Sequence, residues 1–99
     1  MNFADRLYRA IADKGNPILL GLDPHLDLLP QEFEIARDPA RPRAERARWV
    51  ERFCVELSDL AAYVVPAVKP QSAFFEQLGA DGVAAFERVV DHARYVSVA

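Results

Sequence analysis

Short apolar runs alternate along this chain with longer segments whose apolar residues recur at helical spacing. The runs cover residues 18–23 and 63–69, and each is bounded by turn-forming residues and too short for a helix. Both are predicted as strands buried on both faces. Helical spacing predicts helices over residues 3–14, 44–62 and 81–94. Strands that alternate with helices indicate right-handed βαβ units and a parallel sheet.

The segments between these elements carry turn and loop signals. Residues 26–33 are predicted as a partly helical connection, and residues 37–43 and 71–76 as loops. The last helix is expected to turn four apolar residues inward, namely Val83, Phe86, Val90 and Ala93. Residues 95–99 resemble the start of a third strand. Pro66 cannot donate a ladder hydrogen bond, which predicts an edge position or a bulge for it.

The two predicted strands end alike, with a charged residue followed by proline. Asp23 precedes Pro24, and Lys69 precedes Pro70. A cation at the end of a buried strand costs several kcal/mol, as an order of magnitude, unless an anion meets it. If the strands are parallel neighbours, we expect the two charges to project into one pocket, where they can pair. The alternatives are a surface lysine at a strand end and an ordinary turn aspartate before proline.

A small residue lies two positions before each charge, Gly21 before Asp23 and Ala67 before Lys69. Side chains alternate along a strand, so each small residue shares a face with the charge that follows it. This pattern predicts room beneath the charged groups, either for a ligand or for the opposite charge.

Composition limits the class of protein. The chain has 99 residues, of which 52% are apolar and 27% charged, as in one small soluble globular domain. No apolar run approaches the roughly 18 residues of a membrane span, and the amino terminus has no signal-like core, so we expect a cytoplasmic protein without a membrane partner. A single cysteine excludes an internal disulfide and a cysteine-based metal cluster. The net charge of −3 provides no general attraction to nucleic acid.

Three motifs together resemble a known family. Gly21-Leu-Asp-Pro-His25 is followed by Val68-Lys-Pro-Gln-Ser-Ala-Phe-Phe-Glu76 and by Gly79-Ala-Asp-Gly82. This series resembles the orotidine 5′-phosphate decarboxylase family, specifically its longer bacterial subgroup, over nearly the whole chain. The resemblance implies a (β/α)8 TIM barrel and a homodimer. It also implies a cofactor- and metal-independent carboxy-lyase of pyrimidine synthesis, which converts orotidine monophosphate to uridine monophosphate and CO2.

The resemblance also implies roles for individual residues. Lys69 matches the first lysine of the family's alternating Lys and Asp array, which makes it the catalytic candidate. Asp23 matches the aspartate that binds the ribose hydroxyls. Gln71 and Ser72 lie on the loop above the pocket and are predicted to bind substrate. Phe74 on the same loop is left open between a substrate or partner contact and simple packing.

The chain departs from the family where the third strand should end in Asp-x-Lys-x-x-Asp. It stops at Ala99, where that motif should begin, and a (β/α)8 barrel needs about 250 residues. We therefore expect residues 1–99 to be the amino-terminal part of one barrel domain, namely the first two βα units and the start of a third strand. Alone, such a chain is predicted to be inactive and marginally stable, with open strand edges.

Other chemistry-bearing residues are predicted to be structural. His25 is expected to face solvent, His92 to help satisfy carbonyls at a helix end, and Cys54 to be an inert core thiol. Residues 37–52 hold six of the 12 basic residues, and a solvated helix face is favoured there over an RNA-binding patch. The competing function is a non-catalytic half-barrel that serves as a binding or assembly module.

Overall fold

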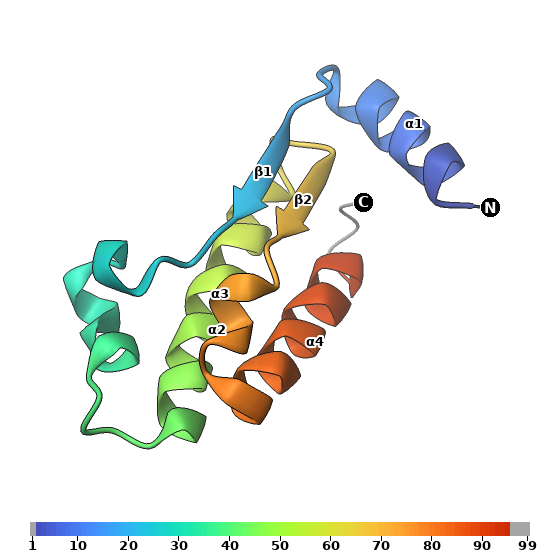
Figure 1. Cartoon of the computed structure of the whole chain (residues 1–99). Coiled ribbons are helices and arrows are strands. Elements are labelled where there is room, and N and C mark those ends of the chain that lie inside the picture. Colours follow the sequence, from blue (N-terminus) through green and yellow to red (C-terminus); the bar gives the residue numbers. More distant parts are fainter. Residues whose placement is uncertain (1, 96–99) are drawn as a thin grey trace.

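The computed structural model describes residues 2–95, with side chains as far as Arg94. The longer elements are α1 (Phe3–Lys14), β1 (Leu19–Leu22), α2 (Arg43–Ala61), β2 (Ala67–Pro70) and α4 (Gly79–Tyr95). The short ones are two 3₁₀ segments, η1 (Leu26–Leu28) and η2 (Gln31–Arg37), and the single turn α3 (Ala73–Glu76). The molecule is elongated, 46 Å by 25 Å by 18 Å, and α1 projects from one end of it (Figure 1).

The sheet consists of β1 and β2, which run parallel in the described part of the chain. Gly21 pairs with Lys69, and Leu22 pairs with Pro70. The predicted βαβ unit is therefore confirmed as a mixed α/β arrangement. The third strand was predicted to start at Tyr95, but Tyr95 is the last residue of α4. The rest of that predicted strand, residues 96–99, lies outside the described residues.

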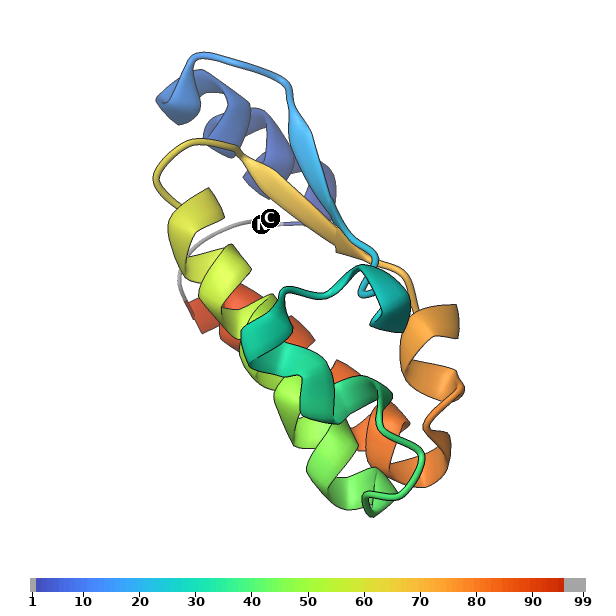
Figure 2. The same cartoon turned by 90° about the vertical axis from the view of Figure 1, so that its left-hand side faces the viewer.

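One face of this sheet carries the core. Leu22 is fully buried, and Leu20 and Val68 pack on the same cluster as the inner residues of α2 and α4. These two helices lie side by side beneath the strands (Figures 1 and 2). The core cluster consists of apolar residues from β1, η2, α2, α3, α4 and the connections between them: Leu22, Leu29, Phe33, Ala36, Ala47, Val50, Cys54, Phe75, Leu78, Ala85 and Val89.

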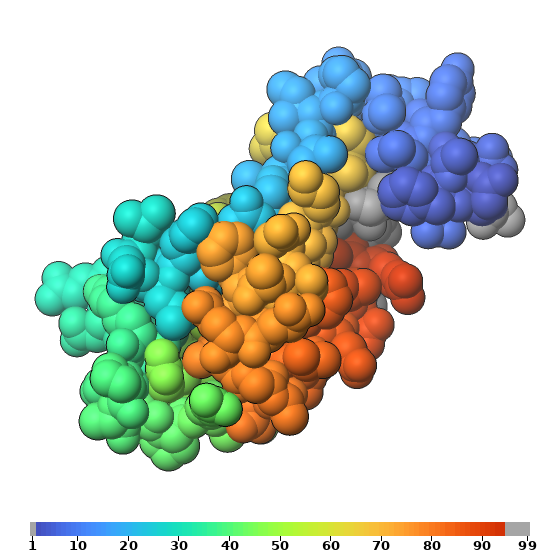
Figure 3. Space-filling view, in the orientation of Figure 1, coloured from blue at the N-terminus to red at the C-terminus, as the bar shows by residue number. Residues whose placement is uncertain are grey.

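The other face of the sheet is open. On this face Leu19 is 50% exposed and Gly21 and Lys69 are exposed, although Ala67, the partner of Leu19, is buried. Figure 3 shows both strands at the surface of the molecule. The prediction that both strands are buried on both faces is thus wrong for the described residues. The reason is that a parallel strand is covered twice only when neighbouring strands and a second layer are present.

Helix α1 is held at its ends rather than by a buried face. The Asn2 side chain accepts from the Asp5 amide at 2.9 Å, and Gly15 ends the helix with φ of 74°. Lys14 Nζ donates to the carbonyl of Ala62. Asn16 donates to the Val64 carbonyl at 2.9 Å. These bonds join the corner before β1 to the corner before β2. The bounds of α1, Phe3–Lys14, confirm the helix predicted over residues 3–14.

Pro66 precedes β2 instead of lying within it. The amides of Val64 and Val65 both bond to the Ala61 carbonyl at 2.9 Å, so the chain still turns away from α2 there. Pro66 is buried and the ladder begins at Ala67. The predicted strand is therefore shorter than residues 63–69. Pro66 does not occupy a bulge or an edge-strand position, because no ladder hydrogen bond is required of it.

The inner face of α4 agrees with the predicted one in part, because Ala93 is buried and Phe86 packs against the core but Val83 is exposed. Ala85 and Val89 are fully buried and Ala93 is nearly so, whereas Val83 is 43% exposed. Gly82 is buried as well. Small residues form the centre of this face because α4 approaches its neighbours closely, and the larger residues that the sequence favoured lie to its sides.

Candidate functional site

The sequence-predicted polar residues gather at the carboxyl ends of the two strands. Leu22 faces the core, so its neighbours Gly21 and Asp23 belong to the open face. Gly21 pairs with Lys69, which places Lys69 on that face also. Gln71 follows two residues later, and its amide bonds to the Leu22 carbonyl at 3.1 Å, which extends the strand pairing. The structure thus brings Asp23, Lys69 and Gln71 to one edge of one face.

Asp23 and Lys69 are diagonal neighbours on this face. Strands about 4.8 Å apart and a rise of about 3.3 Å per residue put their Cα atoms roughly 8 Å apart. Both residues are exposed, and no ion pair joins them among the described residues. The expected pocket and pairing therefore stay predictions, but the spacing leaves the two charges free to meet a ligand placed between them.

Gly21 lies beneath the Asp23 side chain, as the sequence pattern predicted. A methyl group at Gly21 would sit 3.6 Å from Asp23 Oδ2, which is ordinary van der Waals contact. Because Gly21 has no side chain, the Asp23 carboxylate can lie close to the sheet above it. A β-branched side chain would have no such room without displacing the carboxylate.

The loops that follow the strands contact each other. The His25 amide bonds to the Asp23 carbonyl at 2.8 Å, which turns the chain just after the carboxylate. The rings of His25 and Phe74 lie with centroids 4.2 Å apart at 58°. Ser72 is exposed, and its carbonyl accepts from Phe75 and Glu76 at 2.9 Å as α3 begins. The predicted loop over residues 71–76 is therefore partly helical.

Two neighbouring phenylalanines on this segment have different environments. Phe75 is fully buried and meets Phe86 of α4 edge-on at 5.3 Å between centroids. Phe74 is half-buried and turns toward His25. Sequence reasoning did not separate the two, and it missed the aromatic contact, because adjacent Phe residues give no periodic signal.

The edge of the open face combines an ammonium group, a carboxylate and an amide. A cation favours an anionic ligand, and a carboxylate accepts hydrogen bonds from ligand hydroxyls. A sugar phosphate or nucleotide offers both kinds of group. The described residues contain no group of three or more metal-ligating side chains. Nor do they include a helix that is long and apolar enough to cross a membrane.

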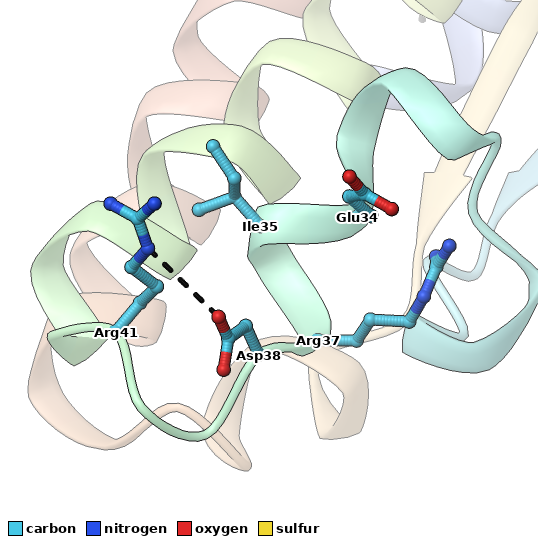
Figure 4. A pocket seen from close by; sticks show the side chains of 5 residues that line it. All are labelled: Glu34, Ile35, Arg37, Asp38 and Arg41. Carbon is cyan, nitrogen blue, oxygen red and sulfur yellow. Dashed lines mark ion pairs between the residues drawn. The ribbon is translucent and has the colours of Figure 1, made fainter.

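A separate pocket lies on η2 and the loop after it (Figure 4). Its lining residues come from one short stretch, namely Glu34, Ile35, Arg37, Asp38 and Arg41. Both arginines of this pocket already have partners. Arg41 pairs with Asp38 at 3.9 Å and with Glu45 at 3.2 Å. Arg37 donates to the carbonyls of Leu26 and Leu29 at 3.2 and 3.0 Å, so it ties η1 to η2.

Two more arginines of residues 37–52 are also engaged. Arg46 donates to the Ala36 carbonyl at 2.9 Å. Arg52 pairs with Glu56 at 3.1 Å and lies over the Trp49 ring at 5.3 Å. Such pairing supports the solvated helix face predicted for this segment over an RNA-binding patch.

Two further candidates are structural in this fold. Cys54 is fully buried, and burial raises the pKa of its thiol to about 12, so the inert core thiol predicted from the sequence is confirmed. His92 Nε2 lies 2.6 Å from Asp59 Oδ1, which links α4 to α2. The sequence could not show this link, because it does not reveal which helix lies alongside, and the role predicted for His92 at the carbonyls of its own helix end stays a prediction.

Comparisons with known proteins relate nearly the whole chain to proteins that share one name. No protein-family model matches it. An orotidine 5′-phosphate decarboxylase of Rhodopirellula baltica is 41% identical over 93 residues, which is 94% of this chain but 30% of that protein. A second, from a Nocardioides species, is 41% identical over 92 residues and again matches over 30% of its length.

A solved structure agrees with these sequence matches. The crystal structure from Streptomyces avermitilis, also described as an orotidine 5′-phosphate decarboxylase, superposes with a TM-score of 0.65 at 35% identity. The match covers 97% of this chain and 30% of that one. The resemblance read from the motifs is therefore confirmed, and so is its extent. The chain spans about 30% of the length of the relatives that it matches.

Proposed function

We propose that this chain, a relative of orotidine 5′-phosphate decarboxylases over nearly its whole length, supplies the first two strand ends of that enzyme's active site. The observation that supports the proposal most directly is the placement of Asp23 and Lys69. Both lie on the open face at the carboxyl ends of neighbouring parallel strands, where (β/α)8 enzymes build their sites. The chain would then form the beginning of one such barrel domain.

Decarboxylation of a pyrimidine nucleotide is accelerated by a fixed positive charge beside the reacting ring carbon. When the bond between the pyrimidine ring and the carboxylate breaks, CO2 leaves and the electron pair stays on the ring carbon. The Lys69 ammonium stabilises that developing negative charge, and a proton must then be delivered to the carbon. Asp23 accepts hydrogen bonds from the ribose hydroxyls, and Gln71 and Ser72 contact the nucleotide from the loop above.

The described residues do not contain a complete set of such groups. The roles assigned here need no metal ion or organic cofactor, because a lysine and a carboxylate perform them. The proton donor and the phosphate grip belong to later strands in the family that the chain resembles. We therefore propose that these 99 residues alone form no uridine monophosphate, and that activity requires a closed barrel, in a cytoplasmic homodimer.

A chimera tests the proposal. Residues 2–94 of this chain replace the 93 matched residues of the Rhodopirellula baltica relative. The chimera should form uridine monophosphate from orotidine monophosphate. Lys69→Ala should lower its kcat/KM by about 100- to 1,000-fold, the usual loss when one electrostatic group aimed at developing charge is removed. Arg9→Ala, at an exposed cation on α1, is the matched control and should leave the rate unchanged.

Two results would contradict the proposal. One is an active chimera in which Lys69→Ala behaves like the parent. The other is uridine monophosphate formation by the purified 99-residue chain, because the described cluster offers only one ammonium group to the reacting ring. Reading the gene downstream of codon 99 for an Asp-x-Lys-x-x-Asp motif is an independent check on the same proposal.

A binding or assembly module remains the second candidate, and the exposed apolar residues favour it. Leu60, Val64 and Leu19 are 67%, 62% and 50% exposed around the strands. Exposed apolar side chains that form a contiguous patch commonly mark an interaction site. This candidate predicts a defined oligomer with cooperative thermal unfolding, measured by size-exclusion chromatography and circular dichroism. A part of an enzyme that lacks its neighbours should show neither.

A further inference from the structure

The loops that follow β1 and β2 meet through two aromatic rings. His25 immediately precedes the η1 segment, and Phe74 lies in the single turn α3. Their centroids are 4.2 Å apart with the planes tilted by 58°, which is within the range of favourable aromatic contacts. The two residues are 49 positions apart in sequence, so the contact joins segments that only the strand pairing brings together.

The strand register explains why these rings meet. Leu22 pairs with Pro70, and the Gln71 amide continues the pairing by bonding to the Leu22 carbonyl at 3.1 Å. Counting onward, Asp23 lies level with Gln71, and His25 reaches the level of α3. Backbone hydrogen bonds therefore hold the segments of β1 and β2 together as far as Gln71, and the ring contact is the next attachment beyond it.

The contact is between the two rings, and the hydrogen bonds of the described residues leave the His25 nitrogens out of it. Among residues 2–94, no hydrogen bond or ion pair engages the His25 imidazole nitrogens, and the side chain is exposed. Phe74 is half-buried and anchored through its neighbour, the fully buried Phe75. Phe74 is thus the more firmly held residue of the pair, and the turn that carries His25 packs against it.

We propose that His25 and Phe74 are a positioning pair that sets the Asp23 carboxylate against Gln71 and Ser72. The purpose of the pair rests on the proposed nucleotide site, whereas the ring contact itself does not. Asp23 is two residues from His25, and its carbonyl accepts the His25 amide at 2.8 Å. When the ring contact is lost, the turn at residues 23–25 loses its attachment to α3, and the carboxylate moves away from the ligand hydroxyls.

Kinetics of the chimera provide the first test. His25→Ala should raise KM for orotidine monophosphate by about 10- to 100-fold, the scale of a misplacement near 1 Å, with a smaller change in kcat. His25→Phe keeps an aromatic face and should restore KM. Phe74→Leu should reproduce the His25→Ala effect, and the double variant should be no worse than the worse single one. Tyr63→Leu, at an aromatic residue that is 86% exposed, is the control.

The variants also separate the two possible roles of the imidazole. If His25→Phe is as impaired as His25→Ala, the nitrogens act and the positioning role is overturned. If His25→Ala leaves KM unchanged in an active chimera, the positioning role fails while the proposed function stands. An inactive parent chimera counts against the proposed function instead, and the second test still decides the contact.

Nuclear magnetic resonance of the 99-residue chain is that second test, and it needs no substrate. Phe74→Leu should shift the amide resonances of Asp23, His25 and Gln71. It should leave those of α1 in place, and Tyr63→Leu should leave all of these unchanged. Asp23 and Gln71 resonances that do not respond to loss of the Phe74 ring would overturn the inference.

Discussion

Replacing Gly82 by alanine should strongly destabilise the corner between α3 and α4. A Cβ at this position would lie 1.8 Å from the Phe75 carbonyl oxygen and 2.9 Å from the Leu78 Cβ. Non-bonded carbon and oxygen atoms approach to about 3.3 Å, so the carbonyl would have to move by roughly 1.5 Å. The obstacle is main chain and belongs to the residue whose ring fills the core, so it cannot rotate out of the way.

The size of the effect follows from two opposing contributions. Overpacking a well-packed site costs about 1 to 3 kcal/mol, and a backbone obstacle places this case at the upper end. Alanine favours a helix over glycine by about 1 kcal/mol. The clash dominates, and we expect a net loss of about 2 kcal/mol or more. That is a large part of the 5 to 15 kcal/mol typical of a whole folded domain.

Urea unfolding of the 99-residue chain, followed by circular dichroism at 222 nm, measures this loss. Gly21→Ala is the matched control, because the added methyl group meets Asp23 Oδ2 at 3.6 Å and needs no displacement. Its free energy of unfolding should stay within about 0.5 kcal/mol of the parent value. A Gly82→Ala midpoint equal to or above that of the parent would refute the close approach on which the reasoning depends.

Three further outcomes are expected. Cys54 should resist thiol reagents at pH 8 in the folded chain and react in denaturant. Burial raises the pKa of Cys54 from 9.0 to about 12, so the stability that its neutral thiol contributes should be lost as pH rises between these values. In alkaline urea titrations the Cys54→Ala variant should not show this loss. Asn16→Ala removes bonds to the Ile18 amide and the Val64 carbonyl and should lower the unfolding free energy by about 1 to 2 kcal/mol, whereas an unchanged thermal midpoint would mean that the corner is held elsewhere. Arg88→Gln, which breaks the 2.6 Å pair with Glu51, should cost under about 1 kcal/mol, and a cost that does not shrink in 1 M salt would show that the pair is not a screened surface contact.

Helix caps and amphipathic patterns predicted those elements whose bounds are set by residues close together in the sequence. Asn2 and Gly15 delimit α1 through a cap and a left-handed residue, and both can be recognised in the sequence. The amphipathic pattern of α2 was found within one residue at each end. The alternation of apolar and polar positions was enough to place Asp23 and Lys69 on the same face once the strands were taken as parallel neighbours.

Packing partners decided the features that the sequence left open or misplaced. Hydrophobicity favours Val83 as an inner residue of α4, but close approach to α2 and α3 gives that face to Ala85 and Val89. Phe74 and Phe75 are identical in sequence terms, and only the position of α4 assigns one to the core and the other to His25.

The sequence by itself determined the order of elements, the charge–proline strand ends and the relationship to orotidine 5′-phosphate decarboxylases, because these depend on residues close together in the chain. The tertiary structure alone decided the register of β1 against β2, the contact of His25 with Phe74 and the exposure of one sheet face. Each of these depends on which distant segments lie together. That choice is made by the summed packing of many side chains, and no single stretch of residues encodes it.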